Sequence, residues 1–250
     1  MLPSAVACWC VRCYIAPAVV IIKLEDDMKA INQTVSRSQE SVIASNRVLK
    51  NTYMLLSLTL LFSAAIAGVS MVLNLPHPGI IITLVGYFGL FFLTNRLKNS
   101  VWGIASVFAL TGFMGYTLGP ILSMYVNFIP NGTELIVTAL GGTGLIFVGL
   151  SAYVLNTKKD FSFLSGMLFT GILVAFLAGL GAIFFEIPSL SIAVSAMFVL
   201  LMSGMILFQT SEIIHGGETN YVMATVSLYI TIYNLFLSLL QLLGIFGSDD

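Results

Sequence analysis

The chain has very little charge. Asp, Glu, Lys and Arg make up only 8% of its 250 residues, whereas they make up about a quarter of an ordinary soluble domain. Hydrophobic residues make up 58%, and the mean hydropathy is +1.01. These values exclude a soluble globular protein and indicate an integral membrane protein in contact with lipid. A basic patch with interleaved aromatic residues is also missing, so nothing points to a nucleic-acid partner.

Cysteine is equally scarce. Cys8, Cys10 and Cys13 are the only cysteines, and all lie at the extreme N-terminal end of the sequence. The rest of the chain can therefore form neither a disulfide framework nor a four-cysteine metal site, and the spacing of the three is not that of a paired C-x-x-C zinc site. We expect no cofactor and no metal centre.

The segment 1–27 fits neither a membrane span nor a signal peptide. Arg12 and Lys23 flank an apolar run of about ten residues, which is too short to cross a bilayer, and no small-residue cleavage site follows it. We expect 1–27 to be a non-native or upstream-start extension, with the natural start at Met28.

Residues 28–52 are polar and lack a strong apolar period. This pattern predicts a flexible cytoplasmic tail, with a short interfacial helix near residues 42–49. Beyond residue 52, long uncharged intervals alternate with short charged or proline-containing connections. A membrane-spanning helix needs about 20 apolar residues, so the sequence predicts an all-α, seven-helix membrane domain over 53–250. The predicted spans are 53–75, 79–94, 101–125, 135–155, 161–185, 187–209 and 221–246.

The positions of the basic residues predict the orientation. From Met28 onward, every Lys and Arg falls either in the tail or in the connections after the second and fourth spans. Basic residues favour the cytoplasmic side, so we expect the N-terminus inside the cell. Seven crossings then place the C-terminus on the far side.

The last predicted span carries a polar stripe at spacings of four, three, four and three: Ser227, Thr231, Asn234, Ser238 and Gln241. These spacings put the side chains on one helix face, which should turn toward protein or a watered cavity because lipid offers no hydrogen-bond partner. The stripe is either a polar pathway or binding cleft, or a set of interhelical hydrogen bonds. It contains no ionisable group.

A second candidate site is the polar connection before that span, which holds Glu212, His215 and Glu218. The spacing of Glu212 and His215 places a carboxylate and an imidazole on one helix face, as in di-iron bundles, but such sites need a second pair. The only other histidine, His77, is predicted on the opposite side of the membrane. The alternative is a solvated loop that turns at Gly216 and Gly217.

Enzyme classes fit poorly, because the sequence lacks paired membrane aspartates and the H-E-x-x-H motif. We therefore expect a protein without catalytic residues. Glycines indicate close helix packing instead: Gly115 and Gly119 form G-x-x-x-G, and 141–144 is a further glycine cluster.

Four ordered motifs resemble the Bax inhibitor (TMBIM) family and look closest to its proteobacterial YccA branch. They are Arg47–Tyr53, Thr111–Phe113 with Leu118–Leu122, Ser151–Tyr153 with Thr157–Leu164, and Ile213–Tyr221. The resemblance implies a seven-helix bundle in the bacterial inner membrane. For the YccA branch it implies binding to, and modulation of, the membrane-anchored AAA protease FtsH.

For the wider family the resemblance implies a calcium or proton leak gated by two acidic residues, one in each of the last two spans. By position these acids correspond to Gln209 and Thr231, neither of which can titrate. Two facing carboxylates can sense pH because the first ionisation raises the second pKa, and that device is not carried over to this chain. The sequence thus predicts a protease modulator first. The alternative is a leak protein lined by Gln209, Thr231 and Asn234.

Overall fold

The computed structural model describes residues 45–246, which form seven α-helices, one short 3₁₀ turn and no strand. The first helix, which we call helix 45–72, is Ser45–Val72. The others are α2 Ile80–Leu97, α3 Trp102–Phe128, α4 Gly132–Thr157, α5 Ser165–Phe184, α6 Pro188–His215 and α7 Tyr221–Phe246, with η1 Ser162–Leu164 before α5. The predicted all-α, seven-helix architecture is confirmed over this part of the chain.

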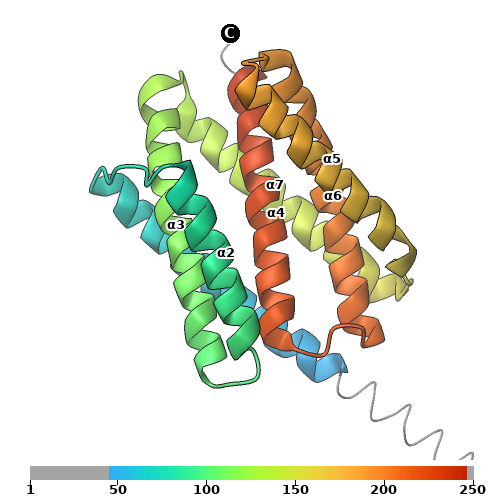
Figure 1. The fold of residues 1–250 in the computed structure, drawn as a ribbon. Helices are drawn as coiled ribbons and strands as arrows, with labels where there is room; N and C mark the ends of the chain where they lie inside the picture. The colour runs from blue at the N-terminus through green and yellow to red at the C-terminus, as the bar shows by residue number, and fades with distance from the viewer. Residues whose placement is uncertain (1–44, 247–250) are drawn as a thin grey trace, which may run out of the picture. The chain divides into compact units, whose positions relative to one another are not determined.

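Six of these helices are long and apolar enough to cross a membrane, and α2 is the shorter exception. Its 18 residues extend about 27 Å, slightly less than the hydrocarbon thickness of about 30 Å. Helix 45–72 and α3 both begin at the lower end of Figure 1, so α2 has to carry the chain back between them. All seven helices therefore run from one end of the bundle to the other.

Two helices extend beyond their predicted spans by six residues or more. The predicted tail reached residue 52, but residues 45–52 are the first two turns of helix 45–72. Ser45 Oγ donates to the carbonyl oxygens of Ile213 and Ile214 at 2.8 and 2.7 Å, and this contact anchors the helix start to the end of α6. The rest of the predicted tail, 28–44, and the predicted extension 1–27 lie outside the described residues.

Helix α6 also continues past its predicted end. It runs to His215, and Gly216 follows in the left-handed region at φ 77°, where a residue without a Cβ is favoured. The Gly217 amide donates to the Glu212 carbonyl at 2.9 Å and closes the last turn. Glu212 and His215 therefore lie in the last turn of α6, which agrees with their placement on a helix and not with the alternative of a solvated loop. Their role as a site stays a prediction.

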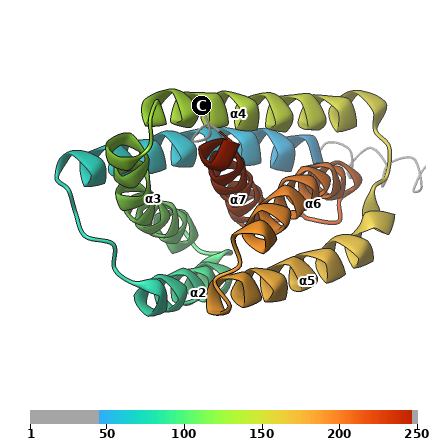
Figure 2. The same ribbon diagram turned by 90° about the horizontal axis from the view of Figure 1, so that it is seen from above.

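Helix α7 occupies the centre of the bundle. Figure 2 shows α3 and α6 beside it, helix 45–72 and α4 along one side, and α2 and α5 along the other. No residue from Tyr221 to Ile245 is exposed, and α7 contributes to each of the three buried apolar clusters, for example through Val222, Leu235 and Phe236. The last helix of the chain is thus the one that the others surround.

Small residues allow helix 45–72 and α3 to approach closely, as predicted for G-x-x-x-G. A Cβ on Gly115 would overlap the carbonyl oxygen of Ser63, and one on Gly119 would overlap the Ser70 side chain. The glycine cluster of α4 behaves differently, because a Cβ on Gly141 or Gly144 would meet nothing within 4 Å. The close approach predicted there is not observed.

Pro120 lies inside α3 and lacks the amide hydrogen that would satisfy the carbonyl of Tyr116, four residues earlier. Ser70 of helix 45–72 supplies the missing donor, since its Oγ lies 3.0 Å from the Tyr116 carbonyl oxygen. Backbone groups at membrane depth need a partner inside the protein. The contact that G-x-x-x-G permits therefore also satisfies the carbonyl that proline leaves free.

All Lys and Arg residues of the described part lie at one end of the bundle, which also holds Asp160, Glu212 and Glu218. The basic residues of the described part lie where helix 45–72 begins and where α2 and α4 end: Arg47, Lys50, Arg96, Lys98, Lys158 and Lys159. Glu134 and Glu186 lie in or beside the connections at the opposite end, where α7 also finishes (Figure 1). We call these the basic end and the acidic end.

Candidate functional site

The predicted polar stripe of α7 divides into two parts. On the side of the basic end, Thr231 pairs with Gln209 of α6: Thr231 Oγ1 lies 3.1 Å from Gln209 Oε1 and 2.9 Å from the carbonyl oxygen of Ser227. Thr231 is buried, and Ser227 and Gln209 are half-buried. These three residues form an interhelical contact without an ionisable group.

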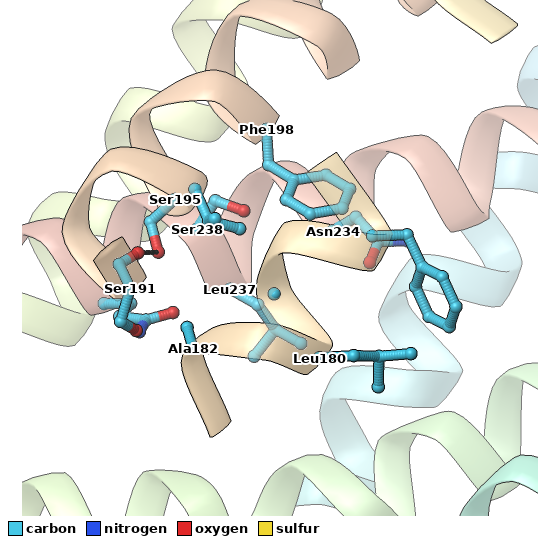
Figure 3. Close-up of a pocket in the computed structure, with 12 residues that line it drawn as sticks. Leu180, Ala182, Ser191, Ser195, Phe198, Asn234, Leu237 and Ser238 are labelled. Carbon is cyan, nitrogen blue, oxygen red and sulfur yellow. Dashed lines mark hydrogen bonds between the residues drawn. The ribbon is translucent and has the colours of Figure 1, made fainter. Parts of the chain in front are cut away.

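On the side of the acidic end, the remaining members of the stripe line a pocket. Asn234, Ser238 and Gln241 face a space of about 320 Å³ between α5, α6 and α7, and Ser191 and Ser195 of α6 lie across from them (Figure 3). The described residues that line this pocket include no Asp, Glu, Lys, Arg or His. Its polarity therefore comes from amides and hydroxyls alone.

Hydrogen bonds hold part of this polar lining in place. Gln241 Nε2 donates to Ser191 Oγ at 2.7 Å, and Ser195 Oγ donates to the Ser191 carbonyl oxygen at 3.0 Å. Asn234 Nδ2 donates to the Ile230 carbonyl oxygen at 2.8 Å. Each amide retains a second N–H and its carbonyl oxygen, and the Ser238 hydroxyl has no bond to another described residue. The pocket can both donate to and accept from a guest.

One part of the stripe thus makes an interhelical contact, and the other part lines the pocket while its Gln241 also bonds α7 to α6. A pathway or binding role for the stripe stays a prediction. Ser191 and Ser195 were not predicted as site residues. Their spacing of four on the preceding span is the same signal that identified the stripe. Two serines alone are a weak signal, because such residues are common in membrane helices.

Glu212, His215 and Glu218 do not converge on one site. His215 faces the α4–α5 connection, with Nε2 3.2 Å from the Lys158 carbonyl oxygen and Nδ1 2.9 Å from that of Ser211. Glu218 Oε1 accepts a hydrogen bond from the backbone amide of Asn220 at 2.8 Å. Within residues 45–246, no three His, Cys, Asp or Glu side chains lie together as they would to hold a metal ion. These hydrogen bonds stabilise the α4–α5 and α6–α7 connections at the basic end.

Asp160 organises the α4–α5 connection beside His215. Its Oδ1 accepts from the Ser162 amide at 2.8 Å, just before η1. This bond from the Ser162 backbone, followed by one from the Ser162 side chain, holds the pKa of the Asp160 carboxyl below its ordinary value. Ser211 Oγ on α6 accepts from the Phe161 amide at 3.0 Å, so the connection is fixed to the end of α6.

Asn220 joins two connections at the basic end. Its Oδ1 accepts from the amides of Val222 and Met223 at 3.0 and 3.2 Å, as an N-cap of α7 does. Its Nδ2 donates to the Lys98 carbonyl oxygen and to Asn99 Oδ1 at 3.2 and 2.9 Å. One side chain thus caps the central helix and fixes the α2–α3 turn.

Two tyrosines on the other face of α7 make further buried contacts that were not predicted. The Tyr229 hydroxyl is bonded to Ser63 Oγ at 2.5 Å and lies 3.3 Å from the Thr111 carbonyl oxygen. The Tyr233 hydroxyl is 3.3 Å from Thr117 Oγ1. Their rings stack with centroids 6.2 Å apart. These bonds tie α7 to helix 45–72 and α3.

Comparison with known proteins places this geometry in context. Residues 45–248 match the family model described as "Inhibitor of apoptosis-promoting Bax1". An uncharacterized protein of Pseudomonas aeruginosa is 55% identical over 227 residues, which cover 91% of this chain and all of that protein. The "Modulator of FtsH protease YccA" of Escherichia coli K12 is 55% identical over 215 residues, 86% of this chain and 97% of that one. The "Inner membrane protein YccA" of Escherichia coli O6:H1 matches equally well.

Proposed function

The chain belongs to the Bax inhibitor family, and on this premise we propose that it is a multi-pass inner-membrane protein that binds and modulates an FtsH-type membrane-anchored AAA protease. One observation carries the proposal: 55% identity to a protein named as a modulator of FtsH, over almost the full length of both chains. The described residues that line the pocket between α5, α6 and α7 include no Asp, Glu, Lys, Arg, His or Cys, which is compatible with a non-enzymatic role.

We propose that the basic end faces the cytoplasm, so that the N-terminus is cytoplasmic and the C-terminus periplasmic. The positive-inside rule supports this orientation, since the described Lys and Arg residues gather at that end. Residues 28–44 precede helix 45–72 in the sequence. They are the segment that a cytoplasmic protease domain would engage first.

Pull-down from native membranes in mild detergent tests the proposal. The full chain, tagged at the C-terminus, should retain the FtsH-type protease, whereas another multi-pass protein expressed at the same level should not. Loss of the protease from the tagged sample to the level of that control contradicts the proposal.

A variant lacking 28–44 separates recognition by the tail from binding by the helices. If the protease engages the tail first, deletion of 28–44 slows degradation of the protein. The amount of protease that still co-purifies with this variant measures the binding that the helices contribute. If the variant is degraded as fast as the full chain and co-purifies as much protease, residues 28–44 are not the segment that the protease engages.

The second candidate function is a calcium or proton leak of the type implied for the wider family. The pocket favours it, because Asn234 and its neighbours leave space between helices instead of closing it. Liposomes with the wild-type protein should then show a flux of calcium or protons that Gln209→Leu alters. Flux equal to that of protein-free liposomes excludes this candidate.

A further inference from the structure

The pocket between α5, α6 and α7 has a defined depth. Asn234 and Gln241 lie seven residues apart on α7, so the polar lining extends about 10 Å along the helix axis. Asn234 is near the middle of Tyr221–Phe246, and Gln241 is close to its end. The pocket therefore reaches from the middle of the bundle toward the acidic end, within one leaflet of the bilayer.

The pocket is continuous with the outer surface of the bundle. Phe176 and Leu180 of α5 line it, and they are also 48% and 38% exposed. Between spans of a membrane protein, exposed apolar side chains of this kind contact lipid acyl chains. A molecule can thus enter from the membrane without passing through water.

The lining selects for a neutral guest. A charged group would lose its hydration without meeting an opposite charge, since amides, hydroxyls and apolar side chains alone surround the space. Ser238 and the second N–H groups of Asn234 and Gln241 can donate to carbonyl oxygens. The apolar part of the wall includes Phe198 and Leu237. The pocket volume of about 320 Å³ is near the lower limit of the volumes of ligand pockets. It can therefore hold one part of a larger molecule.

We propose that this pocket binds the acylglycerol part of a membrane phospholipid. The ester carbonyls accept hydrogen bonds from the amides and hydroxyls of α6 and α7, and one acyl chain lies along Phe176 and Leu180. The charged headgroup stays at the membrane surface near the acidic end. This proposal does not rest on protease modulation.

A photoreactive lipid tests this site. The full chain is reconstituted in vesicles of phosphatidylethanolamine and phosphatidylglycerol that contain phosphatidylethanolamine with a diazirine near the top of one acyl chain. Adducts are mapped by mass spectrometry on the pocket segments 176–182 and 191–198. The lipid-facing side of α4 around Leu145 and Val148, both exposed, gives the background of ordinary lipid contact.

Two matched variants on α7 make the test specific. Ser238→Leu fills the pocket without removing a bond to another described residue, whereas Ser227→Leu alters the same stripe outside the pocket. We expect adducts on the pocket segments several-fold above the α4 background in the wild type and in Ser227→Leu, and a fall to background in Ser238→Leu. Equal labelling of pocket and α4 in the wild type, or unchanged labelling in Ser238→Leu, overturns the proposal.

Native mass spectrometry of the wild-type protein gives an independent measurement that does not depend on any variant. After extensive detergent washing, the protein should retain one phospholipid per chain. A chain that retains none, and takes up none when the same phosphatidylethanolamine is added back, also overturns the proposal.

Discussion

Thr231 on α7 donates a hydrogen bond to Gln209 on α6, with 3.1 Å between Thr231 Oγ1 and Gln209 Oε1. These are the two positions that the family resemblance assigned to a pair of gating acids. The structure places these two side chains in contact, and their correspondence to the acids stays a prediction. An amide and a hydroxyl form a contact between two helices that does not depend on pH, because neither group titrates.

Replacing Gln209 and replacing Thr231 should have non-additive effects on the free energy of unfolding, because the two side chains share one hydrogen bond. Gln209→Leu and Thr231→Val each remove one partner, and the double variant should be less destabilised than the sum of the two by about 0.5–1.5 kcal/mol. Unfolding in mixed detergent micelles measures the cycle. Thr170→Val is the control, because Thr170 is exposed and bonds only within its own helix. Strict additivity of the two single changes would show that the bond contributes nothing.

Ser70→Ala should leave the Tyr116 carbonyl without a donor at membrane depth and destabilise the protein by about 1–3 kcal/mol. In the background of Pro120→Ala, residue 120 regains an amide hydrogen, and the same serine change should cost less. Comparison of the four proteins in unfolding experiments isolates the role of the proline. An equal cost of Ser70→Ala in both backgrounds contradicts this explanation.

Gly115→Ala and Gly144→Ala should act in opposite directions. A Cβ at residue 115 overlaps the Ser63 carbonyl, so separation of helix 45–72 from α3 should cost about 1–3 kcal/mol. At residue 144 nothing lies within 4 Å, and replacing glycine in a helix by alanine favours the helix by up to about 1 kcal/mol. Thermal denaturation in detergent provides the comparison, and a similar loss of stability in both variants would refute it.

Asn220→Asp and Asn220→Ala should separate the two roles of this side chain. Aspartate keeps the acceptor that caps α7 but loses the donor to Lys98 and Asn99, whereas alanine loses both and should cost about 1 kcal/mol more. Hydrogen exchange should show faster exchange at residues 98–100 in both variants. The amides of Val222 and Met223 should remain protected only with aspartate, and equal exchange there would contradict the capping role.

Asp160 should make the α4–α5 connection sensitive to acid. The pKa of its carboxyl is lowered in the folded protein, mainly by the bond from the Ser162 amide, so its contribution is complete above the ordinary value of about 4 and is lost as pH falls through the folded value. The protection of residues 161–164 against hydrogen exchange, measured relative to the intrinsic exchange rate at each pH, should therefore fall below about pH 4 in the wild type. Asp160→Asn should remove this pH dependence, and an identical acid response in both proteins would count against the assignment.

The sequence predicted the seven-helix architecture because charge and proline interrupt long apolar runs. It predicted a short interfacial helix near residues 42–49 but not its unbroken continuation into the first span, since Ser45 finds its acceptors more than 160 residues away on α6. The same limit applies to the site. Spacing placed Asn234, Ser238 and Gln241 on one face, but only tertiary packing determines that Thr231 meets Gln209 while the other three face a pocket.

The central position of α7 has a consequence for how the protein is made. Six helices are synthesised before the segment that they surround. The hydrogen bonds of Ser63 with Tyr229 and of Thr117 with Tyr233 can therefore form only when translation is nearly finished. A chain that stalls before Tyr221 lacks the helix that fills the centre of the bundle. Assembly of this membrane domain is therefore tied to the completion of its own synthesis.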